Sequence, residues 1–218
     1  METGLDGFGW RTLESARIPS TLTWDRDLLL SLPGGRVLDI GCGPAPGSVP
    51  TPGGTRICLD HNLSAVANAR GSTRCDLAVC GDASALPFAA GTFDVVLCKA
   101  VLTAVVDEGR CRSVISESAR VARRGGAVVV SDFLINDRDP YYAARYDACA
   151  VGPYGTFLAV DPSGGSAGDY TARHFDRRWV VDQVAMSDAL DLVGYTEQRV
   201  RTRSGRESVG FTAVVHRR

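Results

Sequence analysis

A short apolar run that ends in two glycines is the most informative feature of this sequence. Residues 37–43 read VLDIGCG, so a strand-like segment gives way at once to Gly41 and Gly43. Glycine tolerates a positive φ angle and lets backbone amides approach a ligand without an intervening side chain. In open α/β sheets, ligands bind where a strand ends and the chain turns. A glycine pair alone occurs in many nucleotide-binding proteins, so its interpretation depends on the residues downstream of it.

Further apolar runs succeed the first along the chain. The first run covers residues 36–40, and the others cover 56–59, 77–80, 93–98 and 126–132. The segments between them can hold helices or turns, and the clearest helix is predicted at 108–123. This alternation predicts an α/β fold, a three-layer sandwich in which helices cover both faces of a mostly parallel, doubly wound sheet.

Near the C-terminus the pattern predicts a different connection. Residues 177–192 carry apolar side chains at helical spacing before Gly194, which predicts a helix that ends there. Residues 197–202 and 208–216 then read as two strands, and the short link between them predicts an antiparallel hairpin. With this hairpin we expect a sheet of about seven strands.

Length and composition fit a single domain. The 218 residues are 44% hydrophobic, which is enough for one α/β core. The N-terminal arm includes a short helix predicted at 27–32, which Thr23 or Asp25 could cap. We divide the chain into this arm and helix (1–35), a ligand-binding core (36–133), a substrate-recognition insertion (134–175), and a C-terminal helix with the hairpin (176–218).

Charge, cysteine usage and the length of the apolar runs argue against a polyanion-binding, a metal-binding and a membrane protein. The net charge is −1 and the sequence pI is about 6.3, so no overall basic surface is available for a polyanion, although the C-terminus is locally rich in arginine. The seven cysteines are scattered without a C-x-x-C pair, which is typical of reduced thiols, and we expect no metal site. No signal sequence opens the chain, and its apolar runs fall short of the roughly 20 residues of a membrane helix. We expect a cytoplasmic protein without membrane contact.

Acidic residues come directly after the second and third apolar runs. Asp60 could accept hydrogen bonds from both hydroxyls of a ribose, although it could also cap a helix. In the segment GDASALPF (81–88), Asp82 could accept from the amino group of adenine while the backbone amide of Ala83 donates to the ring. The FDVV segment at residues 93–96 completes a compound pattern that chance would rarely produce.

On these motifs the chain resembles the class I S-adenosylmethionine-dependent methyltransferases, in particular their small-molecule branch, over roughly residues 36–133. The resemblance implies S-adenosylmethionine as the cofactor. It also implies a set of cofactor contacts: Asp39, Gly41, Cys42 and Gly43 toward the methionine end, Asp60 and His61 toward the ribose, Asp82 and Ala83 at the adenine, and Cys98 at the strand edge that faces the cofactor.

The chain departs from the family pattern after Gly43. The family usually continues with a third glycine and a full helix, whereas residues 44–54 contain four prolines, which cannot sit in a regular helix interior. At most one short turn can remain there. The methionine carboxylate would then depend on loop amides or on an arginine from elsewhere.

The insertion holds the candidate acceptor residues. His174 could act as a general base, or it could be a surface or capping histidine. An aromatic group could line an apolar pocket for a flat acceptor or form the packed face of a helix: Tyr141, Tyr142, Tyr146, Tyr154, Phe157, Tyr170 and Phe175. Of these, Tyr142, Tyr146 and Tyr170 are our predicted acceptor contacts, together with Lys99 and Asp132 at the edge of the sheet. Helix capping would also explain Asp132, and a surface position would explain Lys99.

We therefore expect transfer of a methyl group from S-adenosylmethionine to an oxygen, nitrogen or carbon atom of a small molecule, with secondary metabolites as one acceptor class. A cyclase or rearrangement enzyme of the same fold, an RNA methyltransferase and a non-catalytic scaffold are the alternatives. The segment LCKAVL (97–102) lacks the N/D-P-P-Y/F motif of many enzymes that methylate amino groups, so we do not expect a nucleic-acid partner. A monomer and a homodimer both remain compatible with the sequence.

Overall fold

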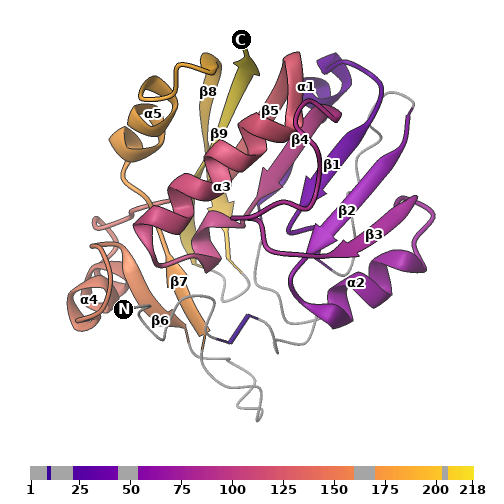
Figure 1. Cartoon of the computed structure of the whole chain (residues 1–218). Coiled ribbons are helices and arrows are strands. Elements are labelled where there is room, and N and C mark those ends of the chain that lie inside the picture. Colours follow the sequence, from indigo (N-terminus) through magenta and orange to yellow (C-terminus); the bar gives the residue numbers. More distant parts are fainter. Residues whose placement is uncertain (1–8, 11–21, 44–53, 160–169, 203–205) are drawn as a thin grey trace.

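A seven-stranded sheet forms the centre of the molecule in the computed structural model, which describes residues 9–10, 22–43, 54–159, 170–202 and 206–218 (Figure 1). Its strand order is β3-β2-β1-β4-β5-β9-β8. The strands are β1 (Val37–Ile40), β2 (Arg56–Asp60), β3 (Leu77–Cys80), β4 (Phe93–Lys99), β5 (Ala122–Leu134), β8 (Leu190–Arg201) and β9 (Glu207–Arg217). Strands β1 to β5 pair in parallel, and β9 pairs antiparallel with both β5 and β8. The predicted parallel sheet with a C-terminal hairpin is confirmed.

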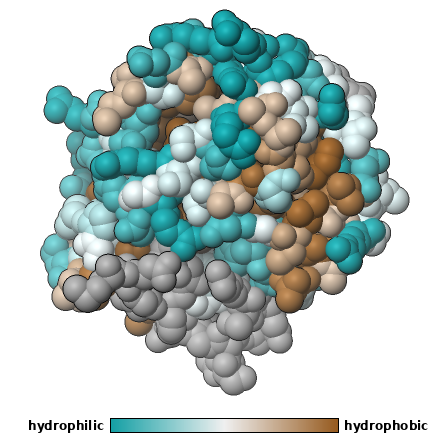
Figure 2. All heavy atoms as spheres, viewed as in Figure 1, coloured by the Kyte–Doolittle hydropathy of each residue, from teal (hydrophilic) through white to brown (hydrophobic). Residues whose placement is uncertain are grey.

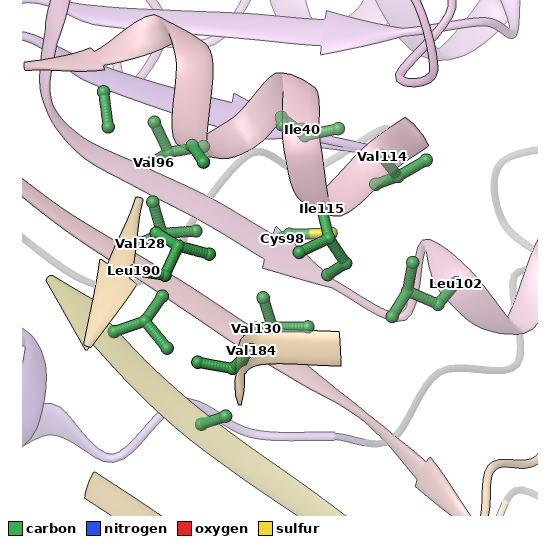
Figure 3. Packing of buried hydrophobic residues seen from close by; sticks show 14 of the residues in the cluster. Ile40, Val96, Cys98, Leu102, Val114, Ile115, Val128, Val130, Val184 and Leu190 are labelled. Atoms are coloured by element: carbon green, nitrogen blue, oxygen red, sulfur yellow. The ribbon is translucent and has the colours of Figure 1, made fainter. Parts of the chain in front are cut away.

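Helices cover both faces of this sheet, as expected for three layers. Helices α3 (Glu108–Val121) and α5 (Arg177–Ala185) pack on one face, where they share the main core with β1, β4, β5 and β9 (Figure 3). Helices α1 (Arg26–Ser31) and α2 (Leu63–Arg70) pack on the other face against two smaller clusters. Because β1 to β5 run parallel, their carboxyl ends meet at one edge of the sheet.

Side-chain caps fix where the helices begin. Asp25 accepts hydrogen bonds from the amides of Asp27 and Leu28 and so starts α1, which confirms one of the two predicted caps. Asn62 caps α2 in the same way, directly after β2. Asp107 caps α3 by accepting from the amide of Arg110.

The predicted helix at 177–192 is wrong in its second half. Helix α5 ends at Ala185, and Leu190 already belongs to β8. Gly194 lies inside β8, next to a shift in the pairing register between Leu192 and Gly194, instead of ending a helix. Apolar spacing suggested a helix there, but a twelve-residue strand against β9 satisfies the backbone of this segment instead.

The described part of the insertion contains one helix and two strands. Helix α4 (Pro140–Ala148) is followed by a two-stranded antiparallel sheet of β6 (Thr156–Ala159) and β7 (Tyr170–Arg173). Leu134, the last residue of β5, forms a bridge with Phe175, which directs the chain back to the main sheet. In Figure 1 these elements lie at the end of the molecule where the parallel strands finish.

On the α3 face, the link between β3 and β4 contains no helix. Figure 2 shows an apolar area on the face viewed there, over β2 and β3. Leu77 of β3 is 55% exposed. None of the helices in the described ranges is long and apolar enough to cross a membrane.

Candidate active site

The two glycines after β1 have the backbone conformation that the sequence predicts. Gly41 and Gly43 adopt φ angles of +63° and +62°, in the left-handed region that favours glycine. A Cβ atom on Gly41 would lie only 2.4 Å from Cγ2 of Val101. The amides of Gly41 and Cys42 both donate to the carbonyl of Leu59, which ties the loop to the end of β2. This loop therefore requires glycine at position 41.

Asp60 supports the same loop from the end of β2. Its Oδ2 accepts from the amide of Gly43 at 2.9 Å, and its Oδ1 accepts from the amide of Asn62 at 2.9 Å. The cap of α2 is Asn62, so the alternative role of Asp60 as that cap does not apply. A carboxylate offers about four acceptor positions, and the two amides leave about two of them. That remainder suits a pair of neighbouring hydroxyls.

His61 comes next in the chain and has an unusual buried nitrogen. Its Nε2 atom is buried and has no hydrogen-bond partner among the described residues. Buried polar atoms nearly always have a partner, and an exception in a site often marks a missing ligand or water. This atom lies one residue from Asp60, where the sequence predicts the sugar or purine.

Asp82 lies just beyond β3, at the same edge of the sheet. Its Oδ1 accepts from both the amide and the hydroxyl of Ser84, at 2.8 and 2.7 Å. Its Oδ2 accepts from Nη2 of Arg110 at 2.6 Å. Ala83, the predicted partner for the purine ring, is half-buried and packs against the main core.

Helix α3 holds the loop that carries Asp82. The carboxylate of Glu117 accepts from the amide of Leu86, and Arg120 donates to the carbonyls of Leu86 and Phe88. Glu117 and Arg120 also pair with each other at 2.6 Å. Sequence reasoning missed these residues and Arg110, because a contact over about 30 positions leaves no local pattern; their shared spacing along one helix was the only signal.

Asp39 and Lys99 influence each other electrostatically at the ends of β1 and β4, beside the glycine loop. Burial raises the pKa of Asp39 to about 6, while the positive charges of Arg56 and Lys99 act in the opposite direction. Burial lowers the pKa of Lys99, and Asp39 opposes that shift. Nζ of Lys99 lies 5.6 Å from the centroid of the Trp24 ring. Lys99 is half-buried, which agrees with the alternative of a snorkelling surface side chain, and its acceptor contact stays a prediction.

Two predicted site residues belong to the protein interior instead. Cys98 is 1% exposed, and its side chain points into the core beside Ile115 (Figure 3). Cys98 pairs in register with Ile40, the last residue of β1, but its side chain lies on the α3 face of the sheet, and its contact with the cofactor stays a prediction. Asp132 is completely buried and accepts hydrogen bonds from the amides of Thr103 and Phe133. It stabilises the short helix η2 (Leu102–Ala104) and cannot reach an acceptor.

Burial has a clear effect on the carboxyl of Asp132. It raises the pKa to about 7, although the amide hydrogen bonds act to lower it. The capping explanation that the sequence left open for this residue therefore accounts for its position.

The aromatic residues of the insertion pack on one another. Tyr142, Tyr146 and Tyr170 are buried together with Phe157 in one cluster between α4 and the small sheet. Tyr170 also contacts the ring of Trp10 edge-on at 4.9 Å. Phe175 does not belong to this group, because it packs in the main core beside Trp179. Tyr142 and Tyr146 thus form the packed face of α4, as the alternative interpretation predicted, and acceptor contact by these rings stays a prediction.

His174 lies inside this aromatic cluster. Nδ1 of His174 is 2.7 Å from the hydroxyl of Tyr146, and the ring stacks on Phe133 with centroids 5.2 Å apart. Burial lowers its pKa to about 3, and the charge of Arg145 acts in the same direction. Such an imidazole is too weak a base for proton removal near neutral pH. We therefore do not retain His174 as the general base, and a surface position is wrong as well.

The end of β4 connects the glycine loop to this cluster. Ala100, directly after β4, adopts a φ of +54°, which non-glycine residues rarely do. It packs against a buried group formed by Leu22, Phe133 and Val200. Because Phe133 stacks on His174, the cluster begins beside the end of β4, close to the edge that carries Asp39 and Gly41.

Comparison with known proteins gives a consistent picture. Residues 38–130 match a family model described as a methyltransferase domain. The chain is 31% identical over 180 residues to a demethylmenaquinone methyltransferase from Mycolicibacterium vanbaalenii, covering 83% of this chain and 76% of the relative. A solved structure of a SAM-dependent methyltransferase from Methanosarcina mazei superposes with a TM-score of 0.77 at 24% identity, covering 89% of this chain and 98% of that one. The cyclase SpnF has a similar fold, with a TM-score of 0.56 at 16% identity over 88% of this chain and 78% of its own.

Proposed function

This chain belongs to the class I S-adenosylmethionine-dependent methyltransferases that act on small molecules, and we propose that it methylates a carbon atom of a flat, apolar, electron-rich ring. The observation that carries this proposal is the aromatic cluster of the insertion, which adjoins the carboxyl ends of β4 and β5. Large rings of this kind supply apolar contact area for a flat ligand.

The residues at the sheet edge fit the cofactor. Gly41 and Gly43 adopt the positive φ angles that turn the loop after β1, Asp60 retains acceptor positions for the ribose hydroxyls, and Nε2 of His61 is a buried atom without a described partner. Asp82 would accept from the adenine amino group, and Asp39 would border the methionine end. S-Adenosylmethionine supplies an electrophilic methyl group carried on a sulfonium. These protein groups bind and orient it so that the methyl carbon can face the acceptor in line.

A carbon acceptor also agrees with the state of His174. Transfer to a hydroxyl or a protonated amine requires a group that removes a proton, and His174 is a weak candidate for that role because burial lowers its pKa to about 3. An electron-rich ring carbon attacks the methyl group with its own π electrons, and the sulfur keeps the electron pair of the broken C–S bond. The methylated ring then carries a positive charge, which makes its ring proton acidic enough to pass to solvent water, and loss of this proton restores the aromatic ring. The relatives' name points to the same chemical class, since demethylmenaquinone carries such a ring once it is reduced to its quinol.

The test uses S-adenosylmethionine with an isotopic label in the methyl group and a short-chain demethylmenaquinone, reduced to the quinol, as acceptor. We expect one label per product on a ring carbon, identified by mass spectrometry and NMR. Label on an oxygen or nitrogen would overturn the carbon assignment. An altered product without label would indicate the cyclase alternative, and label transfer to RNA but not to the quinol would overturn the small-molecule acceptor.

A second measurement addresses the aromatic cluster. Replacing Tyr142 with Ala is expected to raise KM for the acceptor while the Kd for S-adenosylhomocysteine stays unchanged, because the ring lies in the insertion and not at the nucleoside edge. Tyr142→Phe keeps the ring and is expected to behave like the unmodified protein. An unchanged KM in a folded Tyr142→Ala variant would remove the cluster from the acceptor site.

A further inference from the structure

Arg110 contacts Asp82, the carboxylate that the proposed function places at the adenine of the cofactor. We propose that Arg110 is a positioning residue, which holds Asp82 in the orientation that accepts a hydrogen bond from the adenine amino group. The inference rests on the proposed cofactor role of Asp82. It assigns to α3 a direct part in selecting the base.

The hydrogen bonds of Asp82 leave room for one more donor. Ser84 donates twice to Oδ1, and Nη2 of Arg110 donates once to Oδ2 at 2.6 Å. A carboxylate has about four acceptor positions, so these contacts leave about one, on Oδ2. The same Nη2 atom lies 3.4 Å from the hydroxyl of Ser84, so the guanidinium spans both sides of the group. One open acceptor position is what an exocyclic amino group requires.

The start of α3 determines where Arg110 can reach. Asp107 accepts from the amide of Arg110 at 2.7 Å and fixes the first turn of the helix. The nearest acid on the same turn, Glu108, already pairs with Arg112 and with the buried Arg173. Asp82 is thus the carboxylate with which Arg110 pairs in the described residues. Because α3 is packed in the main core, the guanidinium is presented from a rigid element.

The charge of Arg110 also favours the ionised form of Asp82. Partial burial would raise the pKa of this carboxyl, but the hydrogen bonds from Ser84 and the charge of Arg110 outweigh it, so the pKa lies below its usual value. An ionised carboxylate accepts from the amino group of adenine and repels the carbonyl oxygen that hypoxanthine carries at the same position. The pair therefore predicts discrimination between these two bases.

The experiment measures the Kd of S-adenosylhomocysteine and of S-inosylhomocysteine by calorimetry. In Arg110→Met we expect the Kd of S-adenosylhomocysteine to rise about tenfold, because Asp82 loses the orientation in which its charged carboxylate accepts a hydrogen bond from the adenine amino group. The Kd of S-inosylhomocysteine should change less than about threefold, because a released Asp82 can turn away from its carbonyl oxygen. The preference for adenine therefore falls, and Arg110→Lys, which keeps the charge, should restore part of it.

Arg112→Met serves as the matched control, since Arg112 lies on the same helix and pairs with Glu108 instead. It is expected to leave both dissociation constants unchanged. If Arg110→Met weakens both ligands by the same factor, or neither, the positioning role is wrong. Asp82→Asn separates the two levels of inference. If it leaves both affinities and the base preference intact, Asp82 does not contact the adenine, whereas label transfer to the quinol tests the proposed reaction independently.

Discussion

Position 41 requires glycine for two reasons, the positive φ angle of its backbone and the short distance to the side chain of Val101. Its φ of +63° costs a non-glycine residue about 1–3 kcal/mol, and a Cβ would meet Val101 at 2.4 Å. We expect Gly41→Ala to lower the free energy of unfolding by at least that range and to weaken cofactor binding, measured by urea denaturation and calorimetry. Gly71→Ala is the control, because Gly71 has a φ of −83° and its nearest neighbour is 3.6 Å away. Equal effects of the two changes would contradict this explanation.

The buried His174 predicts a specific dependence of stability on pH. Its pKa is about 3 in the folded protein, against about 6.5 in an unfolded chain. Below about pH 6.5 the unfolded chain binds a proton that the folded protein does not, so this residue lowers stability by up to about 1.4 kcal/mol per pH unit down to about pH 3. In His174→Asn this loss is absent. As the pH falls from 7.5 to 5, the free energy of unfolding of the variant should therefore rise relative to that of the unmodified protein.

Denaturant titrations of both proteins at each pH test this expectation. Asp39 and Asp132 have raised pKa values and act in the opposite direction, gaining stability as the pH falls from about 7 toward 4. They are present in both proteins, so their contribution cancels in the comparison. A stability difference that does not vary with pH would show that His174 is accessible to protons in the folded state.

At the residue scale, the sequence predicted the positions that depend on local geometry. Gly41 and Gly43 are explained by the turn after a strand, and Asp25 by the rules for helix caps. The sequence did not predict that the side chains of Asp132 and Cys98 are buried, because apolar runs do not reveal which face of a strand a residue occupies when both faces are buried. Arg110, the charged partner of Asp82, lies on α3 and could not be deduced from local spacing.

At the scale of elements, the link between β3 and β4 depends on α3. Arg120 donates to the carbonyls of Leu86 and Phe88, and Glu117 accepts from the amide of Leu86. We expect Arg120→Met to lower the free energy of unfolding by about 1–3 kcal/mol, because the carbonyl oxygens of Leu86 and Phe88 lose their charged hydrogen-bond donor. Hydrogen exchange at the amides of Leu86 and its neighbours should accelerate, whereas Arg112→Met should leave it unchanged. Unaltered exchange in Arg120→Met would mean that the loop holds its shape alone.

The second half of the predicted C-terminal helix shows where element prediction fails. Residues 190–192, which have apolar side chains at helical spacing, belong to β8 instead. The side of β9 that β5 does not cover pairs with this segment through a ladder of backbone hydrogen bonds. The insertion shows the opposite case. Its aromatic density predicted a local cluster, and α4 with the small sheet forms one, although no pattern in the sequence indicated β6 and β7 as partners.

At the scale of the whole molecule, the alternation of apolar runs was sufficient to predict the sheet and its C-terminal hairpin. Parallel strands joined by crossovers permit few arrangements, and the observed order with β1 and β4 at its centre is one of them. The acceptor could not be deduced in the same way, because the fold is shared with proteins of different reactions, such as the cyclase SpnF. It depends on the insertion and its side chains.

The cofactor site at the carboxyl edge of the sheet is the central claim, and Asp60 tests it most directly. Calorimetric titration with S-adenosylhomocysteine should give a Kd that is weaker in Asp60→Asn by about 1.5–3 kcal/mol, the range for hydrogen bonds to a charged group. The change keeps the shape of the side chain and one of the two oxygens that accept from the amides of Gly43 and Asn62, and circular dichroism of the variant checks that the fold is retained. An unchanged Kd in the folded variant would contradict the placement of the ribose at Asp60.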